Sequence, residues 1–341
     1  MKRVVKFTTP PRFISYSAVG GFEERRGPLG GSFDFCDLGD MFGQSTFELA
    51  EGEMGRLALN IALRKCNLSH KSLDLLVAGD LQNQCVATSV GLESFGTPFL
   101  GVYGACSTCT ESLLISSAML STDDVGIAAV VTSSHNAAAE RQFRGPVEYG
   151  SLRSPSAQWT ATAAGAFILS SDSSVWSKTE RGSVAITEAM AGVVVDGATK
   201  DASNMGGAMA FAAADSIISY FEESRRDPRS IDCIITGDLG RVGSDILCHI
   251  LRERLPSAAP RHMDCGLMLY DMDESDVHSG ASGCGTSASV LACHFLPMLE
   301  RGDLKSVLFL STGAMMSPSS VLQGSNIGGV APLIHLCHIP R

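Results

Sequence analysis

Short apolar runs alternate along the chain with longer segments of helical periodicity. Four runs are rich in apolar and β-branched residues and carry no polar alternation: residues 75–78, 128–131, 233–236 and 307–310. Strands that are apolar on both sides are typical of sheets covered by helices on both faces. The segment with Leu57, Ile61 and Leu63 has the spacing of a helix. This alternation predicts parallel strands joined by crossover helices.

The chain contains two copies of one unit. Residues 72–81 (SLDLLVAGDL) and 230–239 (SIDCIITGDL) share Ser, Asp, Gly, Asp and Leu at matching positions. A second match pairs the GACST turn at 104–108 with GCGTS at 283–287, each followed by a helical stretch and an apolar run. The second copy is longer between its matched segments, and residues 256–280 are the expected insertion.

These patterns predict an α/β fold in which two similar halves pack together as a layered α/β/α/β/α body with two mixed, mostly parallel sheets. The polar stretch SSDSS at 170–174 has turn residues and is the expected join. We therefore expect an N-terminal half at 1–172 and a C-terminal half at 173–341.

Composition narrows the class of protein. The 341 residues are 45% hydrophobic and 18% charged, which suits a chain with a large core. The net charge of −10, without a basic run, argues against nucleic-acid binding. Apolar stretches are far shorter than the ~20 residues of a membrane span, and no apolar signal core follows Met1, so we expect neither a span nor a secretion signal. The 11 scattered cysteines indicate a reducing compartment.

Cys106 is the first candidate for chemistry. It follows the strand-like segment 98–103, Gly104 permits a sharp turn, and a helix is expected to begin near Glu111. Ligands of such sheets bind beyond the carboxyl ends of the strands. A thiol at a helix N-terminus is stabilised as the thiolate by the helix dipole. Cys106 is thus expected to have a lowered pKa.

Other interpretations of Cys106 stay open at this point. A small buried thiol that fills space beside a tight turn fits the pattern equally well. A redox pair with Cys109 is a third interpretation. A zinc site at this Cys-x-x-Cys lacks a second pair of ligands, so no metal site is expected.

A second polar cluster, TSSHN at 132–136, directly follows an apolar run. His135 can act as a base or donate to an anion, and Asn136 both donates and accepts. A helix cap within this segment and a Glu140–Arg144 ion pair is the alternative interpretation. The candidate ligand contacts here are Ser133, Ser134, His135 and Asn136, with Arg144 beyond them.

The second copy adds two candidates. His278 lies in the Gly-rich segment VHSGASG at 277–283, from which it can face the same cleft. Cys284 lies in the matched copy of the Cys106 turn and is a further candidate ligand contact.

These residues carry a family resemblance. A duplicated architecture with Gly-Ala-Cys-Ser-Thr at the start of a helix resembles the thiolase and ketoacyl synthase superfamily, in which that Cys is acylated. Over essentially its full length the chain resembles more specifically the stage V sporulation protein AD family of spore-forming Firmicutes. The matching segments are GPLG at 27–30, LVAGDLQNQ at 76–84, YGACST at 103–108, TSSHN at 132–136, AERQFR at 139–144, NMGGAM at 204–209, TGDL at 236–239, DCGL at 264–267, SGCG at 282–285 and STGA at 311–314.

The resemblance implies a thiolase-like homodimer that binds dipicolinic acid, alone or with Ca²⁺, and helps load it into the developing forespore. It implies other SpoVA proteins as partners, and a cytoplasmic or forespore location peripherally associated with the inner spore membrane. No cofactor is implied beyond Ca²⁺ carried with dipicolinate.

Several positions depart from the enzymes of the superfamily. Thiolases place a catalytic His three residues before Gly-Ala-Ser-Gly, whereas His278 stands two residues before that segment. The Asn of the ketoacyl synthase Gly-Asn-Thr-Ser loop is missing from GCGTS at 283–287, and STGAMMSP at 311–318 replaces the thiolase Cys-Gly-Gly-Gly. A condensation needs groups for the enolate and the oxyanion besides the thiolate. Cys106 by itself does not supply all the groups that a condensation needs.

The resemblance, taken with the incomplete catalytic set, implies a non-catalytic dipicolinate-binding protein. Helix N-terminal amides near Cys106 and donors from the loop of His135 and Asn136 are expected to receive the two carboxylates, with apolar walls against the pyridine ring. One alternative is an acyltransferase or condensing enzyme that uses Cys106 as its nucleophile. Another is a structural scaffold for membrane partners.

Overall fold

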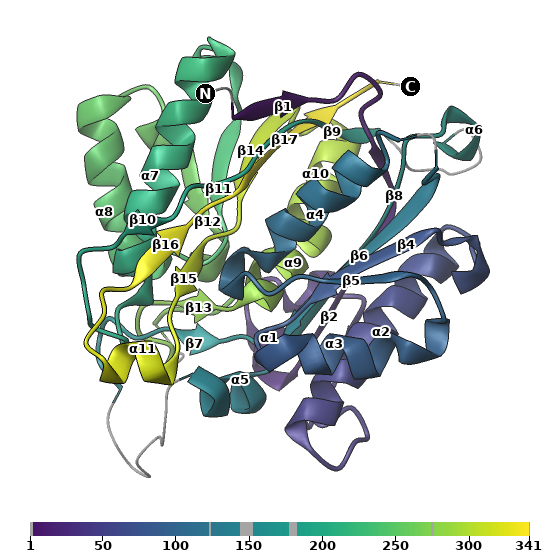
Figure 1. Cartoon of the computed structure of the whole chain (residues 1–341), viewed down its shortest axis with the longest axis horizontal. Coiled ribbons are helices and arrows are strands. Elements are labelled where there is room, and N and C mark those ends of the chain that lie inside the picture. The colour runs from purple at the N-terminus through teal and green to yellow at the C-terminus, as the bar shows by residue number, and fades with distance from the viewer. Residues whose placement is uncertain (1–2, 123, 144–152, 177–182, 274–275, 341) are drawn as a thin grey trace.

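A computed structural model describes the whole chain except residues 1–2, 123, 144–152, 177–182, 274–275 and 341 (Figure 1). The strands of the main sheet are β1 (Val4–Lys6), β2 (Arg12–Gly20), β3 (Phe35–Cys36), β4 (Leu75–Gly79), β5 (Phe99–Gly101), β6 (Ile127–Ser134), β8 (Ala163–Ser170), β9 (Val184–Met190), β11 (Cys233–Thr236), β12 (His262–Asp264), β14 (Ser306–Leu310) and β17 (Leu333–His338). The four predicted apolar runs lie in β4, β6, β11 and β14, which confirms them as strands.

The order of the strands confirms the duplication. The sheet runs β12-β11-β14-β17-β9-β2-β8-β6-β4-β5, with β1 beside β9 and β3 beside β2. Both β5-β4-β6 and β12-β11-β14 are parallel, and both β6-β8-β2 and β14-β17-β9 are antiparallel. The two sets of five strands meet at one residue pair, Arg12 and Ala185, so the two expected sheets are continuous at this point.

Helices and short sheets complete the described chain. The helices are α1 (Phe22–Arg26), α2 (Phe47–Lys65), α3 (Val86–Leu92), α4 (Thr108–Met119), α5 (Asn136–Phe143), α6 (Ser173–Trp176), α7 (Met205–Ser224), α8 (Gly240–Arg254), α9 (Cys284–Val290), α10 (Leu296–Arg301) and α11 (Pro318–Leu322). Two small sheets hold β10 (Val195–Asp196), β16 (Gly328–Val330) and β15 (Gly313–Met315), and β13 (Ala281–Ser282) with β7 (Trp159–Thr160).

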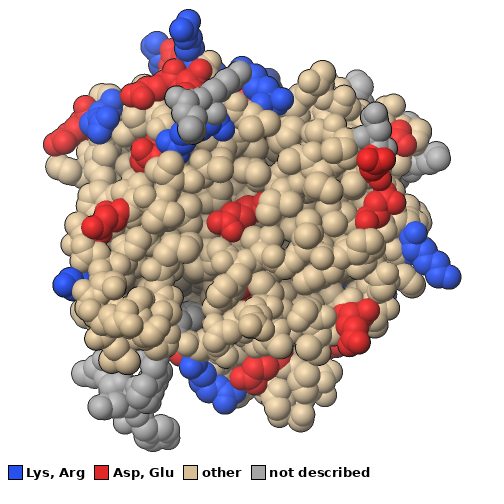
Figure 2. All heavy atoms as spheres, in the orientation of Figure 1, with Lys and Arg blue, Asp and Glu red and all other residues tan. Residues whose placement is uncertain are grey.

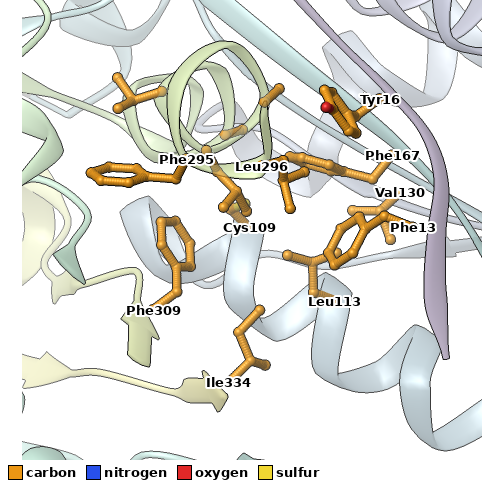
Figure 3. Close-up of a cluster of buried hydrophobic side chains, with 14 of the residues drawn as sticks. Phe13, Tyr16, Cys109, Leu113, Val130, Phe167, Phe295, Leu296, Phe309 and Ile334 are labelled. Atoms are coloured by element: carbon orange, nitrogen blue, oxygen red, sulfur yellow. The ribbon is translucent and has the colours of Figure 1, made fainter. Parts of the chain in front are cut away.

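Three buried clusters separate five layers. One cluster joins α2 to β4, β6 and β8 of the first set of strands, and another joins α7 and α8 to β11, β14 and β17 of the second. The third lies between the two sets and contains α4, α9 and the chain that follows α9. Figure 3 shows this central cluster, in which Cys109 and Leu113 of α4 face Phe167, Phe295 and Phe309. The layers are those of the predicted α/β/α/β/α body.

One expectation about the second half needs correction. Residues 256–280 contain β12, which pairs parallel with β11 as β5 pairs with β4. The start of the expected insertion is therefore the counterpart of a strand in the first half. The additional length follows β12, in the segment that leads to β13 and α9.

Candidate functional site

Cys106 lies where β5 turns into the central helix α4. The strand ends at Gly101, and a 3-10 turn, Ala105–Ser107, precedes the helix. Ala105 adopts a left-handed φ of 52°, while a Cβ at Gly104 would meet the carboxylate of the Glu111 side chain. The sharp turn thus falls at Ala105, one residue later than predicted. The helix begins at Thr108 rather than near Glu111.

The thiol of Cys106 faces a buried carboxylate from the other half of the chain. Asp238 follows β11, and its carboxylate lies close enough to the Cys106 thiol to affect the pKa of both groups. Ser282 Oγ lies 3.8 Å from Cys106 Sγ and donates to Asp238 Oδ2 at 3.2 Å. Asp238 also accepts hydrogen bonds from Gly283 N at 2.9 Å and from Thr312 Oγ1 at 2.9 Å. Residues from both copies of the repeat therefore build one site.

This environment keeps the thiol protonated. Burial and the charge of the neighbouring Asp238 raise the pKa of Cys106 well above its usual range. Burial also raises the pKa of Asp238, to about 6, against the hydrogen bonds that lower it. The predicted lowering of the Cys106 pKa is wrong, because burial and the neighbouring carboxylate outweigh the helix dipole.

A cavity of about 410 Å³ reaches Cys106. Its walls come from the ends of β4, β5 and β15 and from the starts of α7 and α11. Tyr103 Oη donates to Asn83 Oδ1 at 2.8 Å near its mouth. No Lys, Arg or His is among the described residues that line the cavity: Leu81, Tyr103, Ala105, Cys106, Met205, Ala314, Met315, Met316, Ser317 and Ser320.

Charged side chains are sparse on the face of the molecule to which α11 and β15 belong. In the view of Figure 2 this face is mostly uncharged, with Lys and Arg drawn near its margins. Residues of these two elements line the cavity, so few charged side chains lie on this side of it.

The predicted contacts in the 132–136 segment are used inside the fold. Ser133 Oγ donates to Glu51 at 3.2 Å, and Ser134 Oγ donates to the carbonyl of Ala161 at 2.7 Å. Asn136 Nδ2 donates to the carbonyl of Thr160 at 3.0 Å. None of these residues is in the described lining of the cavity. Arg144 lies outside the described residues.

His135 lies away from Cys106. Its ring is 2% exposed, packs 5.3 Å from the ring of Phe47, and places Nε2 2.9 Å from the carbonyl of Asp40. Burial lowers its pKa, so the ring is neutral at pH 7. Nδ1 is buried and has no hydrogen-bond partner within the described part of the chain. The structure does not bring His135 and Cys106 together at the cavity.

Cys284 lies behind the site, at the first turn of α9. Its thiol donates to the carbonyl of Ser133 at 2.9 Å, and burial raises its pKa well above the usual range. It packs with Leu81 and Cys106 in a small buried cluster. Cys284 therefore belongs to the same buried cluster as Cys106 but is not among the described residues that line the cavity.

Two buried acids near Cys284 were not among the predicted site residues. Glu51 Oε2 accepts from Gln82 Nε2 at 2.7 Å, and burial and the charge of Asp80 raise the pKa of Glu51 well above its usual range. Asp80 accepts from Thr88 N at 2.8 Å, and burial raises its pKa. The repeated Gly-Asp-Leu was the available signal for Asp80 and Asp238, because it ends both matched strands.

The structure also places the two residues whose roles were open. Cys109 is fully buried in the central core, and burial raises its pKa to about 12. His278 has a left-handed φ of 49° and lies 3.0 Å from Asp276, outside the described lining of the cavity. Over the residues with described positions, no group of three or more His, Cys, Asp or Glu side chains is arranged to hold a metal ion.

No helix in the described part of the chain has the length and apolar character needed to cross a membrane.

Comparisons with known proteins agree on the fold and the family. The chain is similar in structure to a variant of OleA from Xanthomonas campestris, with a TM-score of 0.60 and 13% identity. The similarity covers 98% of this chain and 99% of that chain. It is also similar to 3-oxoacyl-[acyl-carrier-protein] synthase III from Aquifex aeolicus, with a TM-score of 0.56, 14% identity and coverage of 95% and 99%. At these identities the likeness shows the thiolase-like fold.

Sequence similarity is much closer to a sporulation protein. The chain is 39% identical over 322 residues to stage V sporulation protein AD of Bacillus subtilis, which covers 94% of this chain and 93% of the relative. The model of the family described as "Stage V sporulation protein AD (SpoVAD)" matches residues 1–337. The chain therefore belongs to the stage V sporulation protein AD family, a sporulation family, and has the fold of the thiolase-like condensing enzymes.

Proposed function

We propose that this sporulation protein binds dipicolinic acid without transforming it, in the cavity that ends at Cys106, and so serves dipicolinate uptake into the forespore. The observation that carries the proposal is the cavity itself. Its volume of about 410 Å³ lies in the range of small-molecule sites, and leucine and methionine side chains offer flat apolar contact to a pyridine ring. The Cys106 thiol can donate to a carboxylate oxygen, and so can the hydroxyls of Tyr103, Ser317 and Ser320 once they exchange their present bonds to Asn83 and within the 317–320 turn for the ligand.

The charge of the cavity favours dipicolinate as its calcium complex. A free dianion would enter a cavity without a cation among its described lining residues, and at Cys106 it would approach the buried carboxylate of Asp238. Burial of unpaired charge is costly, and the like charge of Asp238 adds to that cost. The one-to-one complex with Ca²⁺ carries no net charge. Ca²⁺ would then enter as part of the ligand, coordinated by the ligand's own oxygens.

The state of Cys106 supports binding over catalysis. A nucleophilic thiol needs a base or a lowered pKa, and here the neighbouring group is a carboxylate that raises the thiol pKa. His135 and His278 contact Asp40 and Asp276 instead. The set of groups that a condensation requires is therefore not assembled around Cys106 among the described residues.

An acyltransferase or condensing enzyme with Cys106 as nucleophile is the second candidate. The favouring observation is that the apolar cavity ends at the one thiol in its described lining, as an acyl chain would require. Incubation with acyl-CoA thioesters followed by intact mass distinguishes the two. An acyl adduct on Cys106 supports the second candidate, and its absence with saturable dipicolinate binding supports the first.

Calorimetric titration with dipicolinate, with and without Ca²⁺, tests the proposed function. We expect saturable binding in the presence of Ca²⁺ that weakens about tenfold or more in Cys106→Ala, since a buried polar contact to a charged group contributes on the order of 2 kcal/mol. Cys293→Ala is the matched control, because Cys293 is equally buried but lies in the central core. Equal affinity in the wild type and both variants would remove the cavity from consideration.

The proposed partners are a second copy of this chain and other SpoVA proteins at the inner spore membrane. β5 is the last strand of the main sheet and pairs only with β4 among the described strands. Phe99 and Leu100 on this free edge are 38% and 43% exposed, and Val86 and Val90 of α3 are 44% and 52% exposed beside it. An apolar edge without protecting charge favours pairing with the same edge of a second copy.

A further inference from the structure

Cys337 lies at the opposite end of the second set of strands from Cys106. Antiparallel pairing places Cys337 of β17 beside Ser306, where β14 begins. The other end of β14 leads to Thr312, which contacts Asp238 at the cavity. Cys337 is partly exposed. Any chemistry of this thiol is therefore separate from the proposed dipicolinate site.

A relay of hydrogen bonds connects Cys337 to a buried carboxylate. Cys337 Sγ lies 3.4 Å from His335 Nε2, and Tyr220 Oη lies 3.1 Å from His335 Nδ1. Tyr220 donates its single proton to Glu188 Oε2 at 2.7 Å. Its oxygen therefore accepts the proton of Nδ1, which leaves Nε2 to take a proton from the thiol. This is the arrangement of nucleophile, base and orienting acid found in activated thiols.

Two cations hold the carboxylate in its charged form. Glu188 Oε1 lies 2.9 Å from Arg226 and 3.2 Å from Lys6. Burial raises the pKa of Glu188, but the nearby His335 and the hydrogen bonds from Arg226 and Tyr220 outweigh it and hold the pKa well below the usual range. The bond to Cys337 and the nearby Glu188 carboxylate likewise outweigh burial and raise the pKa of His335.

The pKa of the Cys337 thiol shifts in the opposite direction to that of His335. Burial raises the pKa of Cys337, and the hydrogen bond and charge of His335 more than offset this, so its pKa is lowered. Ser306 Oγ lies 2.8 Å from the same nitrogen of His335. Because an alcohol is a far weaker acid than a thiol, Cys337 is the group that ionises toward this imidazole.

The same chain contains a comparable relay that lacks the cations. Cys248 Sγ lies 3.5 Å from His262 Nδ1, His262 Nε2 lies 2.7 Å from Thr236 Oγ1, and Thr236 donates to Asp264 Oδ2 at 2.6 Å. Asp264 has no ion-pair partner among the described residues. Burial raises the pKa of Asp264 to about 7, lowers that of His262 to about 4, and raises that of Cys248.

We propose that Cys337 is a reactive thiolate, formed as an ion pair with His335, and that peroxides oxidise it to the sulfenic acid. The thiolate sulfur attacks one oxygen of hydrogen peroxide, and the O–O bond breaks. Sulfur loses two electrons and becomes Cys–SOH, while the leaving hydroxide takes the proton carried by His335 and departs as water. Cys248, which is also partly exposed, is the internal reference that does not react in this way.

Peroxide treatment of the folded full-length chain tests the proposal. We would add hydrogen peroxide at pH 7 with dimedone to trap sulfenic acid, and quantify labelled peptides by mass spectrometry. Cys337 should be labelled about tenfold or more faster than Cys248, because only a thiolate is nucleophilic enough. Equal labelling of the two cysteines, or faster labelling of Cys248, would overturn the proposal.

Two further measurements separate activation from simple exposure. Glu188→Gln keeps the shape of the side chain and removes the charge that supports the imidazolium, so labelling of Cys337 should fall about tenfold while that of Cys248 stays unchanged. The second measurement needs no variant. The alkylation rate of Cys337 with iodoacetamide should stay high to a lower pH than the rate of Cys248, and coincident pH profiles would contradict the relay.

Discussion

Asp80 and Asp238 occupy equivalent places in the two halves of the chain. Each follows a glycine at the carboxyl end of a matched strand, and each is fully buried. Asp80 Oδ2 accepts from Thr88 N at 2.8 Å, and Asp238 Oδ2 accepts from Gly283 N at 2.9 Å. The neighbours differ, since Asp80 lies near Glu51 and Asp238 lies near the Cys106 thiol. The repeated aspartate thus holds a loop by hydrogen bonds in the first half, and its copy in the second half raises the pKa of the Cys106 thiol.

Removal of the charge at Asp238 should activate Cys106. In Asp238→Asn the neighbouring negative charge is lost, so the pKa of Cys106 should fall and its alkylation by iodoacetamide at pH 8 should accelerate severalfold. Peptide mapping measures the rate. Asp80→Asn removes the equivalent charge from the first half and should leave the rate unchanged. A Cys106 rate in Asp238→Asn no higher than in the wild type would show that Asp238 does not set the state of the thiol.

The stability of the chain should carry a pH dependence from Asp264. Burial raises its folded-state pKa from 3.8 to about 7, so the folded state binds a proton more tightly than the unfolded state. The free energy of unfolding should therefore fall as pH rises from about 4 to about 7 and then level off. In Asp264→Asn this contribution is absent.

Chemical denaturation of both proteins at pH 4.5 and pH 7.5 measures the difference. The stability of the variant relative to the wild type should be greater at the higher pH. A relative stability that does not change, or that moves the other way, would show that the proton is not held more tightly in the folded state.

The layers could be predicted from the sequence because they depend on pattern. Apolar runs without alternation mark strands buried on both faces, and the matched Gly-Asp-Leu segments show the duplication. The state of Cys106 could not be predicted in the same way. Its pKa depends on Asp238, which lies in the other half of the chain and meets Cys106 only when the two halves pack.

The contacts of His135 also could not be predicted from the sequence. His135 follows the end of β6, as ligand residues of such sheets do, but its ring packs against the carbonyl of Asp40 and against Phe47 at the start of α2. The position of a residue along a strand can be read from the sequence. The direction of its side chain depends on packing with distant segments.

The close approach of α9 to β8 depends on a glycine. A Cβ at Gly285 would collide with the carbonyl oxygen of Ala163 and lie 2.6 Å from Ser134 Oγ. Because a main-chain atom cannot give way easily, Gly285→Ala should lower the free energy of unfolding by about 1–3 kcal/mol. Gly31→Ala is the matched control, since a Cβ there meets nothing within 4 Å. Similar denaturation midpoints for the two variants would contradict this packing.

Dimer formation through β5 can be tested with one charge. Leu100→Lys puts a buried cation in the proposed interface, and light scattering at micromolar concentration should show the mass of a monomer where the wild type shows a dimer. Val194→Lys is the control, because Val194 is 72% exposed on a different segment. A dimeric Leu100→Lys protein would show that the chain associates through another surface. A monomeric wild type would show that it does not dimerise under these conditions.

The charge of the bound ligand can be tested by adding a cation to the cavity. Met315 lines the cavity on β15, and Lys has a similar length, so Met315→Lys introduces a positive charge with little change in shape. Met315→Gln is the neutral control. If Asp238 and the lack of cations in the described lining disfavour the free dianion, the Lys variant should bind dipicolinate without Ca²⁺ about tenfold more tightly than the Gln variant. In the presence of Ca²⁺ the neutral complex should gain nothing from the added charge.

Calorimetry of both variants, with and without Ca²⁺, measures the four affinities. An equal gain under both conditions would show that the ligand enters as the dianion even when calcium is present.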